Sequence, residues 1–410
     1  MRKKMIMISH NCHTFFINEI NYAINKFDEL IVICPFNIEI YKQYHNKDNI
    51  KLCFYNKRKI YFNVLKSLPK LINEEIKSEI KSVKKAKLFS VRYIKTLLFY
   101  LAFENIVFES IDRSLEGDSD KHWIGYSGWF SASAYALIKL KRKYKNLYII
   151  SLAHSFEIDE QKNIYYKNLF KSQCHNEMDQ INFISSKMRD YYEQNCAIPL
   201  NLDMNKTNVC YLGCEKKFDG ITNFSNDKVI RIVSCSHVVK VKRVDLIYDS
   251  LSLIKDRNIE WIHFGEGSEM EKLKSKIKIG NQLNTNIKVT LFGSTENSKI
   301  HEYFSKNSID CFINVSSSEG VPISLMEAIA YGIPIIATDV GGNSEIANNN
   351  VGRIIFNNPT PHEVKEAILD IISLEASEKE VMKQNAYNLY KEKFDITRIR
   401  PEFFEKLINS

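Results

Sequence analysis

Residues 310–340 read DCFINVSSSEGVPISLMEAIAYGIPIIATDV, and this stretch decides the fold. The apolar run DCFINVS has the composition of a buried strand. Pro322 and Ser324 mark the start of a helix after a polar loop, and IPIIATDV predicts a second strand. Gly332 and Pro334 mark the end of the helix between the two strands. A strand, a helix and a strand in this order are typical of a βαβ unit in a parallel sheet.

The same alternation runs along the whole chain. Short apolar runs such as MIMIS, LIVICP and LYIISLAH alternate with helical stretches in the first half, and a second series begins near Val229. Two consecutive series predict an α/β protein with two Rossmann-like, doubly wound domains that face each other across a cleft. We expect an N-terminal domain at 1–204, a C-terminal domain at 205–385, and a final helix at 386–410 that packs back towards the N-terminal domain.

Length and composition agree with two globular domains. The chain has 410 residues, of which 44% are apolar and 26% are charged. No apolar run approaches the roughly 18 residues that a membrane-spanning helix needs. The basic start MRKKMIMISHNCH carries too short an apolar run for a signal peptide. The nine cysteines are scattered without paired CxxC motifs, which predicts free thiols, a cytoplasmic location and no metal site.

The positive charge is concentrated in one region. Residues 51–100 carry 13 basic and 3 acidic side chains, mixed with Leu, Ile, Val and Phe in a helical pattern. A basic amphipathic region of this kind indicates an anionic membrane surface or an acidic ligand. The alternative is a solvated lysine-rich face. Nucleic acid is disfavoured as a partner, because no aromatic-interleaved basic motif accompanies the charge.

Two glutamates flank the start of the helix in the opening stretch. Glu319 follows the first strand, in the loop past its carboxyl end, and Glu327 lies in the first turns of the helix. The backbone N–H groups near Ser324 are free at a helix start, which suits a phosphate. An anion site between two carboxylates fits a nucleotide sugar, which has a diphosphate between two sets of hydroxyls. The alternative is that a first-turn glutamate only complements the helix dipole.

The stretch EGVPISLMEAIAYGIPIIATDVGGNSEI (319–346) resembles the signature region of the family 4 (GT4-type) retaining glycosyltransferases of the GT-B fold. It carries the two glutamates separated by seven residues, the G-x-P pair and the DVGG turn followed by Glu. SCSHVVKVKRVDLI and WIHFGEGSEMEKL resemble the strand–loop–helix and the G-x-G turn of the family's C-terminal domain. YSGW, SLAHSFE and NVCYLGC resemble landmarks of its N-terminal domain and linker.

This resemblance implies an activity. The chain would be a retaining glycosyltransferase that moves a sugar from a nucleotide-diphosphate sugar to a lipid-linked oligosaccharide in the synthesis of a bacterial surface polysaccharide (O-antigen, capsule or exopolysaccharide). It would need no cofactor and would dock on the cytoplasmic face of the plasma membrane through residues 51–100. Two alternatives stay open: a nucleotide-sugar 2-epimerase on the same fold, and a non-catalytic membrane-associated GT-B subunit.

The resemblance also implies roles for single residues. Glu327 would hold the ribose hydroxyls, Glu319 would contact the hydroxyls of the transferred sugar, and Lys242 would bind the phosphates. His154 would face the donor sugar from the N-terminal domain. The other donor-binding positions would be Gly320, Val321, Ile323, Ser324, Arg243, His237 and Gly265. Lys242 could instead be a surface charge, and His154 a packing residue at a strand end.

The sequence departs from the family pattern near the phosphates. Ser236 and His237 stand where the family has Gly-Arg, so one fixed cation is missing unless Arg243 or a protonated His237 replaces it. Weak or absent activity is the alternative. Pro322 removes one backbone donor from the anion loop.

Two further motifs bear on the ligands. SHNCHTFF (9–16) replaces the Gly-Gly loop that the family carries near its N-terminus. DSD (118–120) resembles the metal-binding D-x-D of the other main glycosyltransferase fold, but it lies in a polar run without that fold's context. We therefore expect no metal, with Lys242 and the helix start in its place.

Overall fold

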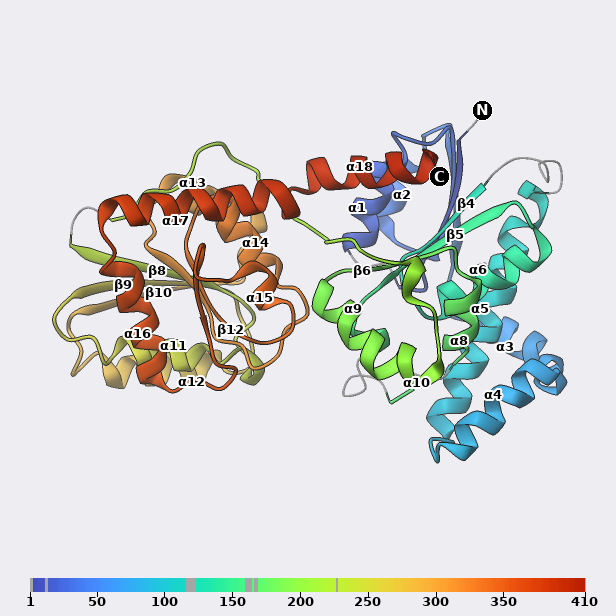
Figure 1. Cartoon of the computed structure of the whole chain (residues 1–410), viewed down its shortest axis with the longest axis horizontal. Helices are drawn as coiled ribbons and strands as arrows, with labels where there is room; N and C mark the ends of the chain where they lie inside the picture. The colour runs from blue at the N-terminus through green and yellow to red at the C-terminus, as the bar shows by residue number, and fades with distance from the viewer. Residues whose placement is uncertain are drawn as a thin grey trace. The chain divides into compact units, whose positions relative to one another are not determined.

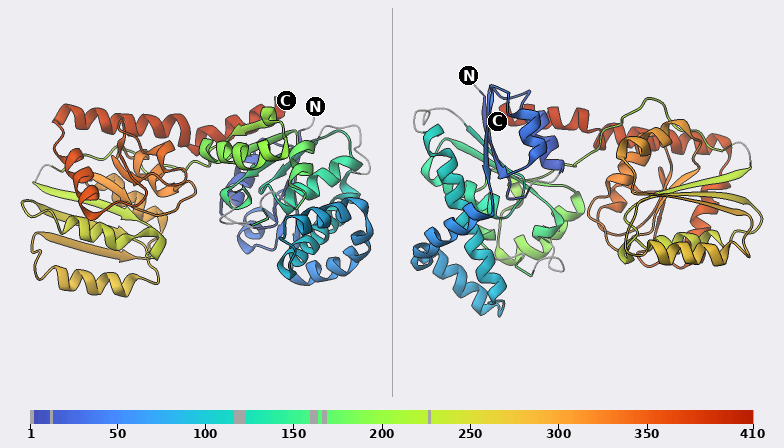
Figure 2. Two further views of the ribbon diagram at one scale, coloured as in Figure 1. Left: turned by 60° about the horizontal axis from the view of Figure 1, so that its bottom comes forward. Right: turned by 180° about the vertical axis from the view of Figure 1, so that it is seen from behind.

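The structure is a computed structural model that describes residues 3–11, 14–115, 123–158, 164–165, 169–225 and 228–409. The chain divides into two compact units (Figure 1). Unit 1 comprises Met1–Cys210 with Arg400–Ser410, and unit 2 comprises Tyr211–Ile399. Each unit is a parallel sheet with helices on both faces, as Figure 2 shows from two further sides.

Unit 1 holds a seven-stranded sheet in the order β3-β2-β1-β4-β5-β6-β7. Its strands are β1 (Lys4–Ile8), β2 (Glu29–Pro35), β3 (Ile50–Tyr55), β4 (Trp123–Ser127), β5 (Leu147–Ala153), β6 (Gln180–Phe183) and β7 (Thr207–Val209). Its helices are α1 (Thr14–Ala23), α2 (Ile38–Tyr44), α3 (Lys57–Ser67), α4 (Glu74–Lys85), α5 (Val91–Leu115), α6 (Ala132–Lys143), α7 (Ser155–Ile158), α8 (Lys171–Glu177), α9 (Ser186–Tyr192) and α10 (Ile198–Leu200). Short helical turns lie at Leu68–Ile72, Glu193–Ala197 and Met204–Lys206.

Unit 2 holds a six-stranded sheet in the order β10-β9-β8-β11-β12-β13. Its strands are β8 (Val229–Cys235), β9 (Asn258–Phe264), β10 (Ile287–Gly293), β11 (Cys311–Asn314), β12 (Ile335–Thr338) and β13 (Gly352–Ile355). Its helices are α11 (Val244–Leu251), α12 (Met270–Gly280), α13 (Asn297–Lys306), α14 (Ile323–Ala330), α15 (Asn343–Ile346), α16 (Pro361–Ile372) and α17 (Ala376–Leu389). Helical turns lie at Lys240–Lys242 and Tyr390–Phe394, and α18 (Ile396–Asn409) follows.

The two sheets share one topology. In each, the first strand lies between the second and the fourth, so the strand order reverses between β1 and β4 and again between β8 and β11. All described strand pairs are parallel. Ligands of doubly wound sheets bind at this switch point, beyond the carboxyl ends of the strands.

The end of the chain is part of the core of unit 1. Phe404 and Leu407 are buried there with residues of β1, β2 and α1. Arg400 places its Nε 2.9 Å from Oε1 of Glu19, and neither side chain is more than 2% exposed. A buried charge is tolerated only beside an opposite charge, which fixes where this segment packs in unit 1.

Nothing in the described part of the chain has the length and apolarity of a membrane-spanning helix.

Candidate active site

The loop after β11 holds the first of the two glutamates. The side chain of Glu319 is 8% exposed, and its Oε1 accepts hydrogen bonds from Nζ of Lys242 at 2.6 Å and Nδ2 of Asn314 at 3.1 Å. Lys242 comes from the loop after β8, across the switch point. Oε2 of Glu319 accepts no hydrogen bond from the described residues. One carboxylate oxygen is therefore held by the protein and the other is left for a ligand.

The second glutamate repeats this arrangement. Glu327 lies on α14 and is 8% exposed. Its Oε1 accepts a hydrogen bond from Nδ2 of Asn297 at 2.7 Å and lies 3.4 Å from Nε2 of His301. Over the described ranges, Oε2 has no hydrogen-bond donor. Helix α13 supplies both neighbours of Glu327, one turn apart.

The buried His301 is itself oriented by Tyr331. Nδ1 of His301 lies 3.0 Å from the hydroxyl of Tyr331, and that hydroxyl oxygen accepts the backbone N–H of Phe218 at 3.2 Å. Burial raises the pKa of Tyr331 to about 12, so the phenol keeps its proton at neutral pH.

The backbone between the two glutamates is rich in free donors. Helix α14 begins at Ile323, and its N-cap residue Pro322 makes no side-chain cap. The N–H groups of Gly320, Val321, Ile323 and Ser324 donate to no acceptor in the part of the chain that the structure describes. The first turn of a helix carries the positive end of its dipole, and an anion there receives these N–H groups.

A glycine turn supports this loop from the side of β12. Gly341 has φ +52°, and a Cβ at this position would lie 2.2 Å from the carbonyl oxygen of Glu319. Gly342 donates its N–H to the carbonyl oxygen of Gly320 at 2.6 Å. The glycines of the DVGG turn therefore allow the backbone of the Glu319 loop to approach closely.

The loop after β8 is supported in the same way. Gly265 has φ +138°, and a Cβ there would lie 1.9 Å from the carbonyl oxygen of Ser236. His237, the next residue of this loop, is exposed. Its role as a substitute cation stays a prediction, and Gly265 takes part in the site through its backbone packing.

Arg243 holds the loops together with most of its donors. Its guanidinium donates to the carbonyl oxygens of Val315 at 2.6 Å, Ser316 at 3.0 Å and Asn357 at 2.8 Å, and to Oδ1 of Asn358 at 3.0 Å. Burial lowers its pKa, against the effect of Asp245. Four of the five guanidinium N–H groups are thus used within unit 2. Arg243 thus connects the loops, and its predicted contact with the donor stays a prediction.

Two buried groups beneath the site are neutral. Nδ1 of His263 lies 2.8 Å from Oγ of Ser234, which accepts the indole N–H of Trp261 at 2.9 Å. Burial lowers the pKa of His263 to about 4. Burial, with the charge of Glu327 adding to it, raises the pKa of the Cys235 thiol to about 12, which makes it a poor nucleophile.

His154 belongs to unit 1, at the carboxyl end of β5. Its ring centroid lies 4.5 Å from that of Trp129 and 4.6 Å from that of Phe15, and its Nε2 lies 3.2 Å from the carbonyl oxygen of Gly128. Its backbone N–H donates to Oε2 of Glu157 at 2.9 Å. The residue is 8% exposed, so most of its surface packs against these neighbours.

Residues 216–389 match the family model described as "Glycosyl transferases group 1". The match covers less than half of the 410 residues. The amylovoran biosynthesis glycosyltransferase AmsK of Erwinia amylovora is 25% identical over 165 residues, which are 38% of this chain and 40% of AmsK. The GtfA subunit of a UDP-N-acetylglucosamine–peptide N-acetylglucosaminyltransferase of Streptococcus agalactiae is 27% identical over 169 residues, which are 39% of this chain and 31% of that subunit. The matches thus span well under half of these two relatives.

Solved structures resemble this chain over nearly its whole length. The lipopolysaccharide outer core galactosyltransferase WaaB aligns with a TM-score of 0.67 at 15% identity, over 98% of this chain and 99% of that one. Anabaena Alr3699/HepE in complex with UDP aligns with a TM-score of 0.66 at 12% identity, over 99% and 100%. The predicted α/β architecture of two doubly wound domains is confirmed, and it is the GT-B fold.

Unit 2 holds Lys242, Glu319, Gly320, Val321, Ile323 and Ser324, and the roles predicted for them stay predictions. Asn297 and His301 were missed. Their spacing of four residues on one helix places both on the same face and was the available signal. DSD (118–120) lies outside the described residues. Among the described residues, no group of three His, Cys, Asp or Glu could hold a metal ion.

Proposed function

We propose that this chain is a glycosyltransferase that moves a sugar from a nucleotide-diphosphate sugar to a glycan acceptor, with retention at the anomeric carbon. One observation carries the proposal. Glu319 and Glu327 each have one carboxylate oxygen held by the protein and the other open, at the two ends of a loop whose backbone N–H groups are unused. A carboxylate that only complements a helix dipole has no need of a hydrogen-bond donor that holds one oxygen and leaves the other open.

Each part of a nucleotide sugar can be assigned to residues of this loop. The N–H groups of Ile323 and Ser324 with the ammonium of Lys242 would bind the diphosphate, Glu327 the ribose hydroxyls, and Glu319 the transferred sugar. An ammonium has three N–H donors, so Lys242 keeps two for phosphate oxygens while it holds Glu319. Lys242 would thereby offset the negative charge of the leaving diphosphate and also orient Glu319, the carboxylate that binds the sugar.

The reaction then needs little covalent help from the protein. The bond between C1 and the diphosphate oxygen breaks, the acceptor oxygen forms its bond to C1 on the same face, and the hydroxyl proton passes to the leaving diphosphate. Negative charge grows on the diphosphate as the bond loosens, and Lys242 with the helix start stabilises it.

The proposed acceptor and biosynthetic pathway are inferred from the names of relatives. The matched relatives include an amylovoran biosynthesis glycosyltransferase and an O-antigen biosynthesis glycosyltransferase, WclY of Escherichia coli. We infer a lipid-linked glycan acceptor in the synthesis of a bacterial surface polysaccharide, bound by unit 1 beyond the carboxyl ends of its strands.

The test is a transfer assay with radiolabelled nucleotide-sugars and a lipid-linked acceptor, read by product mass. We expect Glu319→Ala, Glu327→Ala and Lys242→Ala each to lose about 10²–10³-fold in kcat, the usual effect of removing one stabilising group. Glu271→Ala, a change at an 85% exposed side chain of α12, is the matched control. Undiminished transfer by all three site variants would overturn the assignment.

A second candidate is a non-catalytic subunit that keeps the fold. It is favoured by Ser236 and His237, which leave the loop after β8 without the expected arginine. Calorimetric titration with nucleoside diphosphates separates the two, because an enzyme with the loop described above binds them and a remnant does not. An epimerised donor formed without acceptor would indicate the 2-epimerase.

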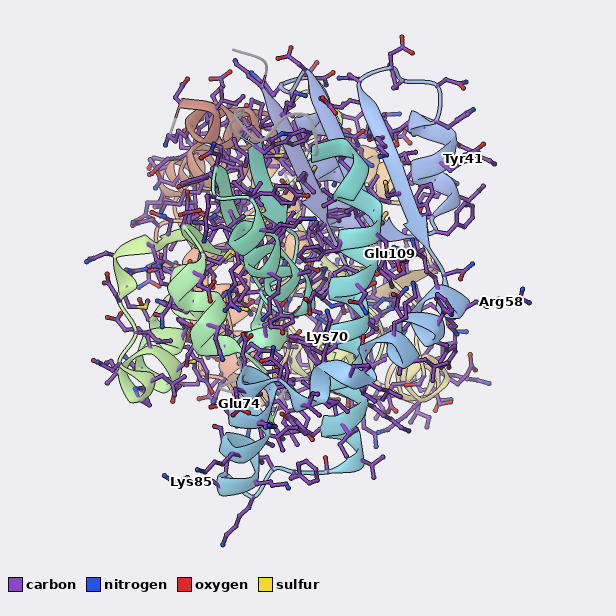
Figure 3. All side chains as sticks on the ribbon, turned by 90° about the vertical axis from the view of Figure 1, so that its right-hand side faces the viewer. Tyr41, Arg58, Lys70, Glu74, Lys85 and Glu109 are labelled. Carbon is purple, nitrogen blue, oxygen red and sulfur yellow. The ribbon has the colours of Figure 1, made fainter. Side chains whose placement is uncertain are left out.

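The surface of α3, α4 and the start of α5 supports docking on an anionic membrane. Tyr61, Leu65, Ile72 and Val91 are 66–75% exposed, which is unusual for apolar side chains. Basic side chains occur along the same segment of the chain, and Arg58 and Lys85 extend outward from the ribbon in Figure 3. Others are Lys59, Lys81, Lys84, Lys87, Arg92 and Lys95. Apolar side chains among cations match the boundary between acyl chains and anionic headgroups.

Vesicle flotation tests the docking. Changing Lys81, Lys85 and Lys87 to Glu should abolish flotation with vesicles that contain anionic lipid, since each Lys near such a surface contributes about 1 kcal/mol. The same charge change at 272, 274 and 278 on α12 of unit 2 should leave flotation intact. Equal flotation of the unmodified chain with and without anionic lipid would contradict the proposal.

A further inference from the structure

The protons around His301 can be counted. Nε2 of His301 lies 3.4 Å from Oε1 of Glu327, and a carboxylate oxygen can only accept a hydrogen bond. Nε2 is therefore the ring nitrogen that carries the proton of a neutral imidazole. The other nitrogen, Nδ1, lies 3.0 Å from the hydroxyl of Tyr331, whose oxygen also accepts the backbone N–H of Phe218 at 3.2 Å. Tyr331 therefore donates, and Nδ1 of His301 accepts.

This hydrogen bond fixes the tautomer of the neutral imidazole. When Nδ1 accepts, the ring proton sits on Nε2. Nε2 lies 3.4 Å from Oε1 of Glu327, so an N–H is presented to a carboxylate oxygen that Asn297 already holds at 2.7 Å. Asn297 donates to Oε1 and the imidazole lies beside the same oxygen, so neither neighbour occupies Oε2.

We propose that His301 is a positioning residue. It holds Glu327 with Oε2 directed to the ribose hydroxyls of a nucleoside diphosphate, and Tyr331 keeps it in the tautomer that can do so. The inference rests on the proposed function, in which Glu327 binds the ribose. It adds the device that makes one oxygen of Glu327 available. It also links the donor site to Phe218, whose N–H the hydroxyl of Tyr331 accepts.

A packing role is the competing explanation, since His301 is 1% exposed and its ring lies edge-on to Tyr331 at 5.5 Å. The two explanations differ in selectivity. A packing defect would weaken every ligand of the site alike. Loss of a positioning residue weakens only ligands with ribose hydroxyls, because only these contact Glu327.

The experiment is a titration with paired ligands on the full chain. The probes are UDP, GDP, CDP and ADP, followed by the 2′,3′-dideoxy form of whichever binds most tightly. His301→Leu should weaken binding of the ribo form about tenfold, the usual effect of losing a hydrogen bond to a charged group, and change the dideoxy affinity less than about twofold. His301→Gln keeps a side-chain donor and should recover most of the affinity. Equal weakening of both forms by His301→Leu would overturn the proposal.

Glu327→Ala separates this proposal from the one on which it rests. If Glu327→Ala affects both forms alike, Glu327 does not bind the ribose and the donor-site assignment fails. If Glu327→Ala is selective for the ribo form and His301→Leu is not, only the role of His301 fails. Tyr331→Phe supplies a measurement that needs no ligand. ¹⁵N NMR of the imidazole should show the Nε2–H tautomer in the unmodified chain and a gain of Nδ1–H in the variant. An unchanged tautomer would contradict the role of Tyr331.

Discussion

The switch points of the two sheets have the same topology and different chemistry. In unit 2, the loops after β8 and β11 bring together Lys242 and Glu319, an ion pair beside unused backbone donors. In unit 1, the loops after β1, β4 and β5 carry His10, Trp129 and His154. Ligands of doubly wound sheets bind at such switch points, and the side chains there decide which ligand is bound.

The rings of unit 1 form one connected cluster. Centroids lie 5.8 Å apart for His10 and Trp129, 5.3 Å for Phe15 and Trp129, and 4.5 Å for Trp129 and His154. The nearby Lys171 is buried, and its Nζ donates to the carbonyl oxygen of Phe130 at 2.9 Å. Flat aromatic faces suit the C–H faces of a sugar ring, whereas the ion pair of unit 2 suits a diphosphate and hydroxyls. The contrast supports acceptor binding by unit 1 and donor binding by unit 2.

The largest expected effect comes from breaking the backbone packing of unit 2. Gly341→Ala places a methyl group 2.2 Å from the carbonyl oxygen of Glu319 in the structure as it stands, so the loop must move. Displacement of a binding loop by about 1 Å costs on the order of 10²-fold in activity. We expect that loss in nucleoside diphosphate affinity and in transfer, measured by calorimetry and by the assay above.

Gly220→Ala is the control for that variant. Gly220 also has a positive φ, +94°, but a Cβ there meets nothing within 4 Å. Both variants should lose stability from backbone strain, and only Gly341→Ala should lose donor binding. Similar donor affinity in the two variants would mean that the DVGG turn does not support the Glu319 loop.

The structure shows which parts of this site a sequence can predict. The strand, loop and helix around Glu319 were predictable, because apolar runs and the Pro and Gly signals that bound them are local. The structure has them as β11, α14 and β12. The partners of Glu327 were not, because Asn297 and His301 lie about 30 residues away and meet it only when α13 packs on the sheet. The carbonyl groups that accept from Arg243 were not predictable either, because they too are distant in the sequence.

The second expected effect is a dependence of stability on pH. It has opposite signs for a buried histidine of unit 2 and a buried glutamate of unit 1. Burial holds the pKa of His263 in unit 2 at about 4, against about 6.5 in an unfolded chain. The unfolded state therefore binds the proton first, so this contribution to stability is complete above pH 6.5 and is lost as pH falls towards 4. At pH 5 the loss is ~2 kcal/mol. Unfolding midpoints at pH 5 and pH 7.5 should differ more in the unmodified chain than in His263→Gln, and an equal difference would contradict the assignment.

Glu157 in unit 1 should show the opposite slope. Burial raises the pKa of Glu157 to about 8, against the effect of Lys171, from a usual value of 4.5. The folded state binds the proton more tightly here, so stability is full below pH 4.5 and falls as pH rises towards 8. Glu157→Gln keeps an acceptor for the N–H of His154 and should remove this fall. Unfolding midpoints across pH 5–8 check it, and an unchanged slope in Glu157→Gln would exclude Glu157 as the source.

The smallest expected effect tests the comparison most directly. Trp129→Ala removes the ring that contacts those of His10, Phe15 and His154. An aromatic contact contributes about 0.5–1.5 kcal/mol beyond its buried area. We expect the KM for the glycan acceptor to rise up to about tenfold, with the KM for the donor unchanged. Trp129→Phe should recover part of the loss because it keeps an aromatic face. If instead the donor KM rises and the acceptor KM does not, the ring cluster serves the donor, and the division of labour between the two switch points is wrong.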